Sequence, residues 1–234
     1  MSKLITIEWQ KNNLAGYGIR AVICMFIIFG MVGGMALMSN AQNEPMFLDF
    51  AAFMSLANIF VRITFVVFSG ILISRLVIEE YRSKTMQLLF TYPLQRKKVI
   101  QAKLMIVVIF CFIWVLMSTL IIEGLTIALN PTVHFFETPV TMGALLDTMP
   151  SVILASAMTA GLSLIPLSFG MRKKSTATTI TSSVIIGTLL NAMVSDGSGS
   201  SVSMFQWIGV PIMFCVFGVA VAYLSYRKID RIDV

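Results

Sequence analysis

The sequence predicts an all-α polytopic membrane protein with six transmembrane helices, an N-terminal interfacial helix and a short cytoplasmic helix between spans two and three. Hydrophobic residues make up 57% of the 234 positions and charged residues only 12%, which is about half of the roughly 25% typical of soluble domains. Six spans of about 20 residues each use roughly half of the chain. Residues 1–234 therefore form a single transmembrane domain with no room for a separate globular one.

The basic residues point to a definite topology. Apart from Arg62 and Arg75, they fall into four clusters, whereas residues 39–54, 130–149 and 195–204 contain no Lys or Arg. Because Lys/Arg-rich segments stay on the cytoplasmic side of a membrane, the sequence predicts six crossings with both termini inside. The clusters are Lys3, Lys11 and Arg20; Arg82, Lys84, Arg96, Lys97, Lys98 and Lys103; Arg172, Lys173 and Lys174; and Arg227, Lys228 and Arg231.

Residues 1–15 do not resemble a cleaved signal, because they mix polar and apolar positions and a long apolar run follows them. Ile5 and Trp9 share one face at helical spacing, and a Trp beside basic residues is typical of the headgroup layer. We therefore expect an interfacial helix here, with a cytoplasmic tail as the alternative.

The six spans are expected in order along the chain. Pro166 lies inside the fourth span and should bend it, whereas Pro150 suits the first turn of that span, where a missing N–H costs nothing. The expected spans are 21–38, 57–78, 104–129, 149–171, 178–194 and 205–226.

Two spans carry small or polar residues at helix-packing intervals. Gly30 and Gly34 in the first span have the G-x-x-x-G spacing that allows close helix association, either between subunits or within one subunit. In the polar fifth span, Ser183, Gly187 and Asn191 recur at i, i+4 and i+8, so this stripe either packs against a neighbouring helix or lines a transport pathway. We expect this span to lie away from lipid.

Two charged residues lie deep within apolar runs, Arg62 in the second span and Glu123 in the third. An exposed central Arg costs roughly 2.5–3.5 kcal/mol on insertion scales, so each should face protein, water or a partner. At about 1.5 Å per residue the two reach similar depths, which predicts an intramembrane pair. That pair would be either a structural contact or part of the transport pathway.

The longest inward-facing segment, 79–103, far exceeds the 2 to 8 residues that usually connect two helices. Residues 79–91 favour a short helix that ends at Pro93, with Met86, Leu89 and Phe90 as an apolar ridge. Such a helix either docks in a groove on a cytosolic partner or lies on the membrane surface.

This segment resembles the first cytoplasmic loop of ABC type-2 permeases, in the string Glu80-x-Arg82-x-Lys84-Thr85, then Leu88-Leu89, then Pro93-x-x-Arg96 and Lys103. The small six-span permeases of lantibiotic-immunity, bacitracin-resistance and peptide-toxin exporters are most similar in size and layout. The resemblance implies that the short helix is a coupling helix seated on an ATPase subunit. It assigns the coupling role to Glu80, Tyr81, Arg82, Lys84, Thr85, Leu88 and Leu89, with Arg172 and Lys173 as a second contact.

The outer loops depart from the family pattern. Residues 195–204 are too short for the hairpin that many members carry before the last span, and the longer outer loop is 130–148. We expect Phe135 and Phe136 of that loop to rest on the outer leaflet. His134, the single histidine, is expected to be solvated.

The sequence has no G-x-x-x-x-G-K-[ST] motif, so ATP and Mg²⁺ are expected on a separate ATPase chain, with no catalytic site, metal or cofactor here. Cys24, Cys111 and Cys215 each lie alone within a span and are expected to be buried apolar residues. Nucleic acid is not expected as a partner, because the basic residues flank apolar runs and suit the inner leaflet.

The resemblance implies a multi-pass subunit of an exporter in a bacterial cell membrane. It would act with a second copy or a homologous permease, and would move an amphipathic substrate such as an antimicrobial or toxin peptide. The alternatives are a heme-export subunit of cytochrome maturation and a membrane scaffold or sensor that does not transport.

Overall fold

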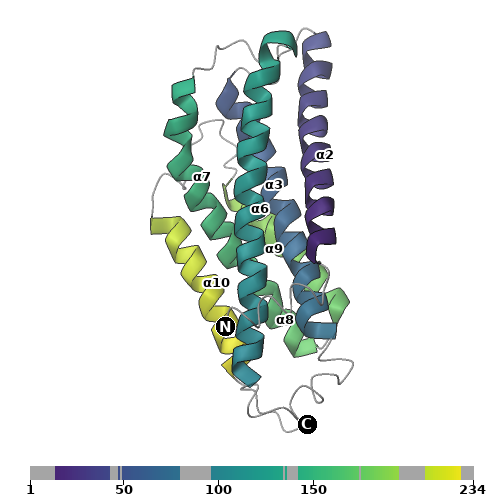
Figure 1. The fold of residues 1–234 in the computed structure, drawn as a ribbon, viewed down its shortest axis with the longest axis vertical. Coiled ribbons are helices and arrows are strands. Elements are labelled where there is room, and N and C mark those ends of the chain that lie inside the picture. The colour runs from purple at the N-terminus through teal and green to yellow at the C-terminus, as the bar shows by residue number, and fades with distance from the viewer. Residues whose placement is uncertain are drawn as a thin grey trace.

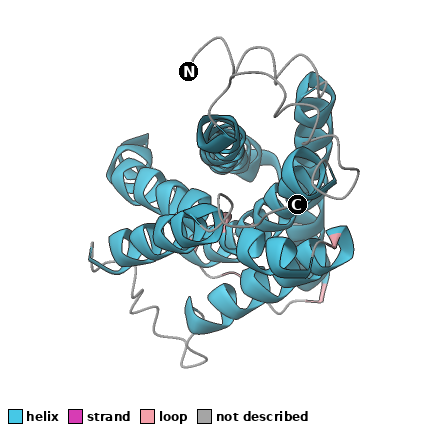
Figure 2. Cartoon of the chain, turned by 90° about the horizontal axis from the view of Figure 1, so that it is seen from below, coloured by secondary structure: helices cyan, strands magenta, loops and turns pink. Residues whose placement is uncertain are grey.

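The computed structural model describes residues 14–42, 47, 49–79, 96–133, 135, 142–173, 175–194 and 209–227, in which all regular structure is helical. Figures 1 and 2 show these helices as one elongated bundle. The predicted all-α class is therefore confirmed. The helices are α2 (Leu14–Ala41), α3 (Phe50–Ile73), the π-helical η1 (Ser74–Ile78), α6 (Arg96–Val133), α7 (Met142–Leu162), α8 (Ile165–Lys173), α9 (Thr176–Val194) and α10 (Gly209–Arg227).

Four helical stretches within the described residues are long and apolar enough to cross a membrane: Gly16–Ala41, Phe50–Ile78, Val99–Val133 and Thr148–Lys173. Two shorter apolar helices, Thr176–Leu189 and Ile212–Leu224, match the expected fifth and sixth spans in position. The chain is thus a polytopic membrane protein. The count of six spans and the sidedness of the termini stay predictions.

The longest helix, α6, runs the full height of the bundle (Figure 1). Its 38 residues extend about 57 Å at 1.5 Å per residue, well beyond a hydrocarbon core of about 30 Å. Residues 96–103, which the sequence had placed in the cytoplasmic loop, form its first turns. The loop between α3 and α6 is correspondingly shorter, and its residues 80–95 lie outside the described part of the chain.

The expected bend at Pro166 is confirmed, because α7 ends at Leu162 and α8 begins at Ile165. Proline has no N–H to bond to the carbonyl of Leu162, and its ring clashes there. The N–H of Leu167 instead bonds to Leu164, and the Ser163 carbonyl accepts a long 3.5 Å bond from the Ser69 hydroxyl of α3. Pro150 lies further inside its helix than expected, because α7 begins at Met142.

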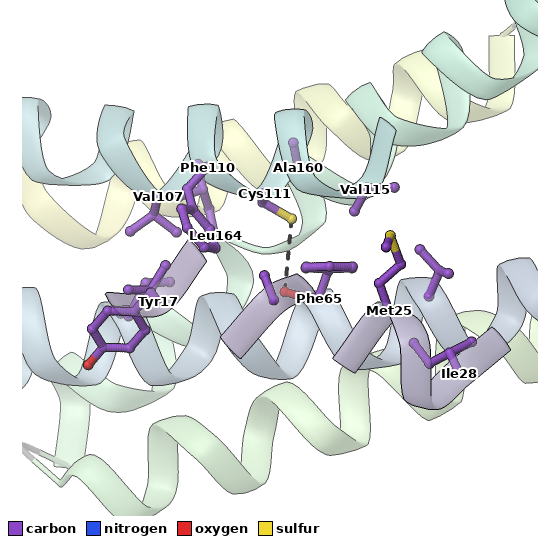
Figure 3. Close-up of a cluster of buried hydrophobic side chains, with 14 of the residues drawn as sticks. Tyr17, Met25, Ile28, Phe65, Val107, Phe110, Cys111, Val115, Ala160 and Leu164 are labelled. Carbon is purple, nitrogen blue, oxygen red and sulfur yellow. Dashed lines mark hydrogen bonds between the residues drawn. The ribbon is translucent and has the colours of Figure 1, made fainter. Parts of the chain in front are cut away.

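The core is built around α3, which packs against α2, α6 and α9. Figure 3 shows side chains in this core, among them Tyr17 and Met25 of α2, Phe65 of α3 and Phe110 of α6. The thiol of Cys111 points at the Phe65 carbonyl at 3.9 Å, so this cysteine is the buried residue that the sequence predicted. Cys24 and Cys215 are only partly buried.

Phe135 corrects the prediction for the outer loop, because it is 4% exposed and lies inside the bundle rather than on a leaflet. Its ring contacts Phe29 of α2 and Phe53 of α3, and its N–H bonds to the Asn130 side chain at 3.0 Å. It also covers Gly33, where a Cβ would lie 3.3 Å from the ring. Phe135 thus packs between α2 and α3.

The backbones of α7 and α10 come close together at Gly161 and Gly218. A Cβ added to Gly218 would collide with the carbonyl of Gly161, and one added to Gly161 would lie 2.7 Å from the Cα of Cys215. Small residues allow this approach of two membrane helices. The contact joins the last helix to the rest of the bundle.

Candidate functional site

The proposed coupling residues of the loop, Glu80, Tyr81, Arg82, Lys84, Thr85, Leu88 and Leu89, lie outside the described residues. The structure does describe the helix ends on both sides of that segment. These ends are η1, followed by the exposed Glu79, and the beginning of α6 at Arg96.

The proposed second contact, Arg172 and Lys173, forms the last turn of α8, and both side chains are exposed. Cations at a helix C-terminus interact favourably with its dipole, so this position suits them. The chain then turns directly into α9 at Thr176, and both α8 and α9 contact η1. The two predicted contact regions therefore leave the bundle from neighbouring helix ends.

Glu123 is buried, at 2% exposed, in the last third of α6. The Thr148 hydroxyl of α7 donates a hydrogen bond of 2.8 Å to its Oε1, whereas its Oε2 is buried without a hydrogen bond. A buried carboxylate oxygen without a donor is costly in a low-dielectric interior. No sequence pattern pointed to Thr148, because the contact depends on how α6 and α7 pack.

Arg62 lies on the α3 side that faces the bundle and is partly buried. An Arg62–Glu123 ion pair is not among the contacts that the structure gives for the described residues, and Glu123 meets Thr148 instead. The pairing therefore stays a prediction.

Two residues of the small and polar stripe on α9, Ser183 and Gly187, pack against α3. Ser183 is fully buried and packs directly on Gly70 of α3. A Cβ added to Gly70 would lie 2.5 Å from the Oγ of Ser183. Gly187 is buried against Ile63 of α3, where a Cβ would lie 3.6 Å from the Ile63 Cα. These contacts favour the packing alternative over pathway lining, and the Asn191 side chain lies outside what the structure describes.

The expectation that the fifth span lies away from lipid holds for only one of its faces. Ile185 and Leu189 are more than half exposed in this single chain, and Thr181 and Thr188 are exposed beside them. Both threonine hydroxyls donate back to carbonyls of their own helix. This face is therefore open to lipid or to another chain.

Gly30 and Gly34 of α2 have open space around them, because a Cβ added to either would meet nothing within 4 Å. They therefore do not serve close packing with another described helix of this chain. Their predicted role at a subunit interface stays a prediction.

Lys103 is a residue whose position the sequence did not predict. It was expected at the cytoplasmic end of a span, but its side chain is fully buried, at 0% exposed. In the sequence, Lys103 stands out only as the last residue of the pattern that resembles a permease loop. That pattern does not indicate where the Lys103 side chain points. Among the described residues, no group of three or more His, Cys, Asp or Glu side chains is placed to hold a metal ion.

Comparison with known proteins gives two matches that cover most of the chain. The family model described as "ABC-2 family transporter protein" matches residues 4–191. The uncharacterised protein YcbO of Bacillus subtilis (strain 168) is 34% identical over 230 residues, which is 98% of this chain and 99% of that protein. No solved structure matches the chain.

Proposed function

Because the chain belongs to the ABC-2 family of transporter proteins, we propose that it is the membrane subunit of an ATP-driven exporter whose ATPase is a separate chain. The family match carries this proposal, since residues 4–191 include the segment between α3 and α6 and the end of α8. The sequence contains no phosphate-loop motif, which supports an ATPase on another chain.

We place the ATPase contact on residues 80–91, with Arg172 and Lys173 beside it. The exposure of these two cations at the end of α8, next to η1, supports this placement. A second copy of the chain, or a homologous permease, completes the transporter in this proposal. The open space at Gly30 and Gly34 supports an association face on α2.

The proposed substrate is an amphipathic molecule, with an antimicrobial or toxin peptide as the first candidate, exported from a bacterial cell membrane. The peptide class rests on the resemblance of the loop pattern to small permeases of lantibiotic-immunity and bacitracin-resistance exporters. The exposed apolar side chains of α2, α9 and α10 supply the lipid-facing surface that such a subunit needs.

Co-purification tests the ATPase contact directly. We expect the tagged chain, extracted in mild detergent, to retain an ABC ATPase encoded beside it. Glu80→Lys and Leu89→Asp should each remove that ATPase, because they reverse a charge and break the apolar ridge, while leaving the amount of chain in the membrane unchanged.

The matched control is Arg20→Gln, a change of an exposed cation on α2, which belongs to neither of the regions that we place against the ATPase. It should retain the ATPase. Full ATPase retention by both loop variants would contradict the docking role of residues 80–91 and favour a helix lying on the membrane surface.

A further inference from the structure

Lys103, in the second turn of α6, makes an unusual contact for a basic residue at the end of a membrane helix. A lysine in this position normally extends its ammonium group towards the water–lipid interface. Here the side chain is completely buried, and its Nζ donates a hydrogen bond of 2.9 Å to the main-chain carbonyl of Leu76. Because a buried cation is costly without hydrogen bonds, this contact fixes where the ammonium group lies.

The acceptor belongs to η1, the π-helical turn that ends the α3 helix. The Glu79 N–H bonds to the carbonyl of Ser74, five residues earlier, which is the π-helical pattern. Such wide turns occur mostly as single bulges and frequently at functional sites. A side chain that enters the hydrogen-bond ladder of a helix is one known cause of local distortion, and Lys103 does so at the centre of this turn.

The remaining surface of η1 packs against α8 and α9. A Cβ added to Gly170 of α8 would lie 3.1 Å from the Ile78 Cδ1 and would also collide with the Thr179 hydroxyl of α9. Leu76, Val77 and Ile78 are each no more than 1% exposed. One turn of π-helix therefore contacts α6, α8 and α9 together.

These four helix ends flank both regions that we place against the ATPase. Residues 80–91 lie in the chain between η1 and α6, and Arg172 and Lys173 end α8 just before α9 begins. A force applied to either segment reaches the bundle through η1 and its neighbours. Lys103 provides a polar link between the two helices that flank the longer of these regions.

We propose that Lys103 is a positioning residue that fastens η1 to α6, so that the ends of α3, α6, α8 and α9 move as one block when the ATPase moves. The proposal rests on the proposed function, because it takes residues 80–91 as the ATPase contact. Without the Lys103 bond, motion of that segment would deform η1 instead of moving the membrane helices.

The first test measures hydrogen–deuterium exchange by mass spectrometry on the full-length chain in lipid nanodiscs. We expect Lys103→Met to raise exchange of the amides in residues 74–79 by about tenfold or more, because a hydrogen bond from a charged group is lost. Exchange in α7 and α10 should not change. Arg75→Met is the matched control, because it removes an exposed cation from η1 itself and should leave exchange in residues 74–79 as in the wild type.

The second test measures substrate moved per ATP hydrolysed by the complex with its ATPase. We expect Lys103→Met to bind the ATPase and hydrolyse ATP but to move at least about fivefold less substrate per ATP, and Lys103→Arg to recover most of the loss because it keeps a charged donor. Wild-type exchange in the Met variant would overturn the proposal. Raised exchange with wild-type coupling would also overturn it, because the bond would then be only structural.

Lys103→Gln covers the case in which the Met variant does not reach the membrane. It keeps an amide donor but shortens the reach, so exchange in residues 74–79 should rise above the wild type, and unchanged exchange would overturn the proposal. If the wild-type chain binds no ATPase, the proposed function fails. The exchange test on the chain alone still decides whether Lys103 holds η1.

Discussion

At the scale of single residues, Glu123 shows how a membrane protein accommodates a carboxylate within an apolar helix. One oxygen accepts a hydrogen bond from Thr148 of the next helix, and the other is buried without a hydrogen bond. The Thr148 hydroxyl is therefore a stabilising contact between α6 and α7.

Thr148→Val tests this contact, because it keeps the shape of the side chain but leaves a buried oxygen without its donor. We expect the free energy of unfolding to fall by about 1–3 kcal/mol, measured as a lower melting temperature in detergent. Thr132→Val is the control, since the Thr132 hydroxyl is exposed and bonds only within α6. Equal melting temperatures of the two variants would show that Thr148 does not stabilise the bundle through Glu123.

At the scale of helices, glycines decide which pairs approach closely. Gly161 and Gly218 bring the backbones of α7 and α10 together, whereas Gly124 of α6 has open space where a Cβ would be. Substitution by alanine should therefore destabilise the protein at Gly218 but not at Gly124.

Gly218→Ala should lower the free energy of unfolding by about 1–3 kcal/mol, because the added methyl group collides with the Gly161 carbonyl. Gly124→Ala should have no destabilising effect, since Ala favours a helix by up to about 1 kcal/mol over Gly. Thermal melts in detergent measure both variants. A Gly218→Ala protein as stable as the wild type would mean that α7 and α10 do not meet as described.

Gly30→Leu and Gly34→Leu test the association face on α2. Nothing described in this chain lies near either position, so the melting temperature of the isolated chain should not fall. Association of two differently tagged copies should fall severalfold, because a large side chain keeps the helices apart. Undiminished co-purification of the two copies would exclude this face as the subunit interface.

The helix positions follow well from hydropathy, and the Pro166 break follows from the chemistry of proline. The tertiary contacts that complete the bundle cannot be predicted from hydropathy. Phe135 reads as a loop aromatic in the sequence, but tertiary packing on Phe29 and Phe53 buries it. Lys103 reads as one more cytoplasmic cation, because nothing local reveals that α3 ends in a π-turn with a carbonyl in reach.

At the scale of the whole molecule, the charge pattern predicts sidedness. In a background without Cys24, Cys111 and Cys215, Gln42→Cys should react with a membrane-impermeant maleimide added outside the cell. Ser175→Cys should react only after the membrane is opened, because it follows a basic cluster. Labelling of Ser175→Cys from outside in intact cells would overturn the six-span topology.

The candidate site can be predicted only in part from the sequence, because part of it depends on contacts between separate chains. The loop pattern indicates a contact with an ATPase, and the family match to residues 4–191 agrees with that class of protein. The path of the substrate depends on how two membrane subunits meet, and one chain's sequence does not specify that arrangement.

The central claim is that this chain exports an amphipathic peptide with energy from a separate ATPase. Its most direct test is uptake of a fluorescent lantibiotic or bacitracin into inside-out vesicles that contain the chain and its ATPase. We expect uptake that requires ATP and is lost with Glu80→Lys while the chain remains in the membrane. ATP-dependent uptake that is equally strong in vesicles lacking the chain, or no uptake by an assembled and ATP-hydrolysing complex, would contradict the claim of peptide export.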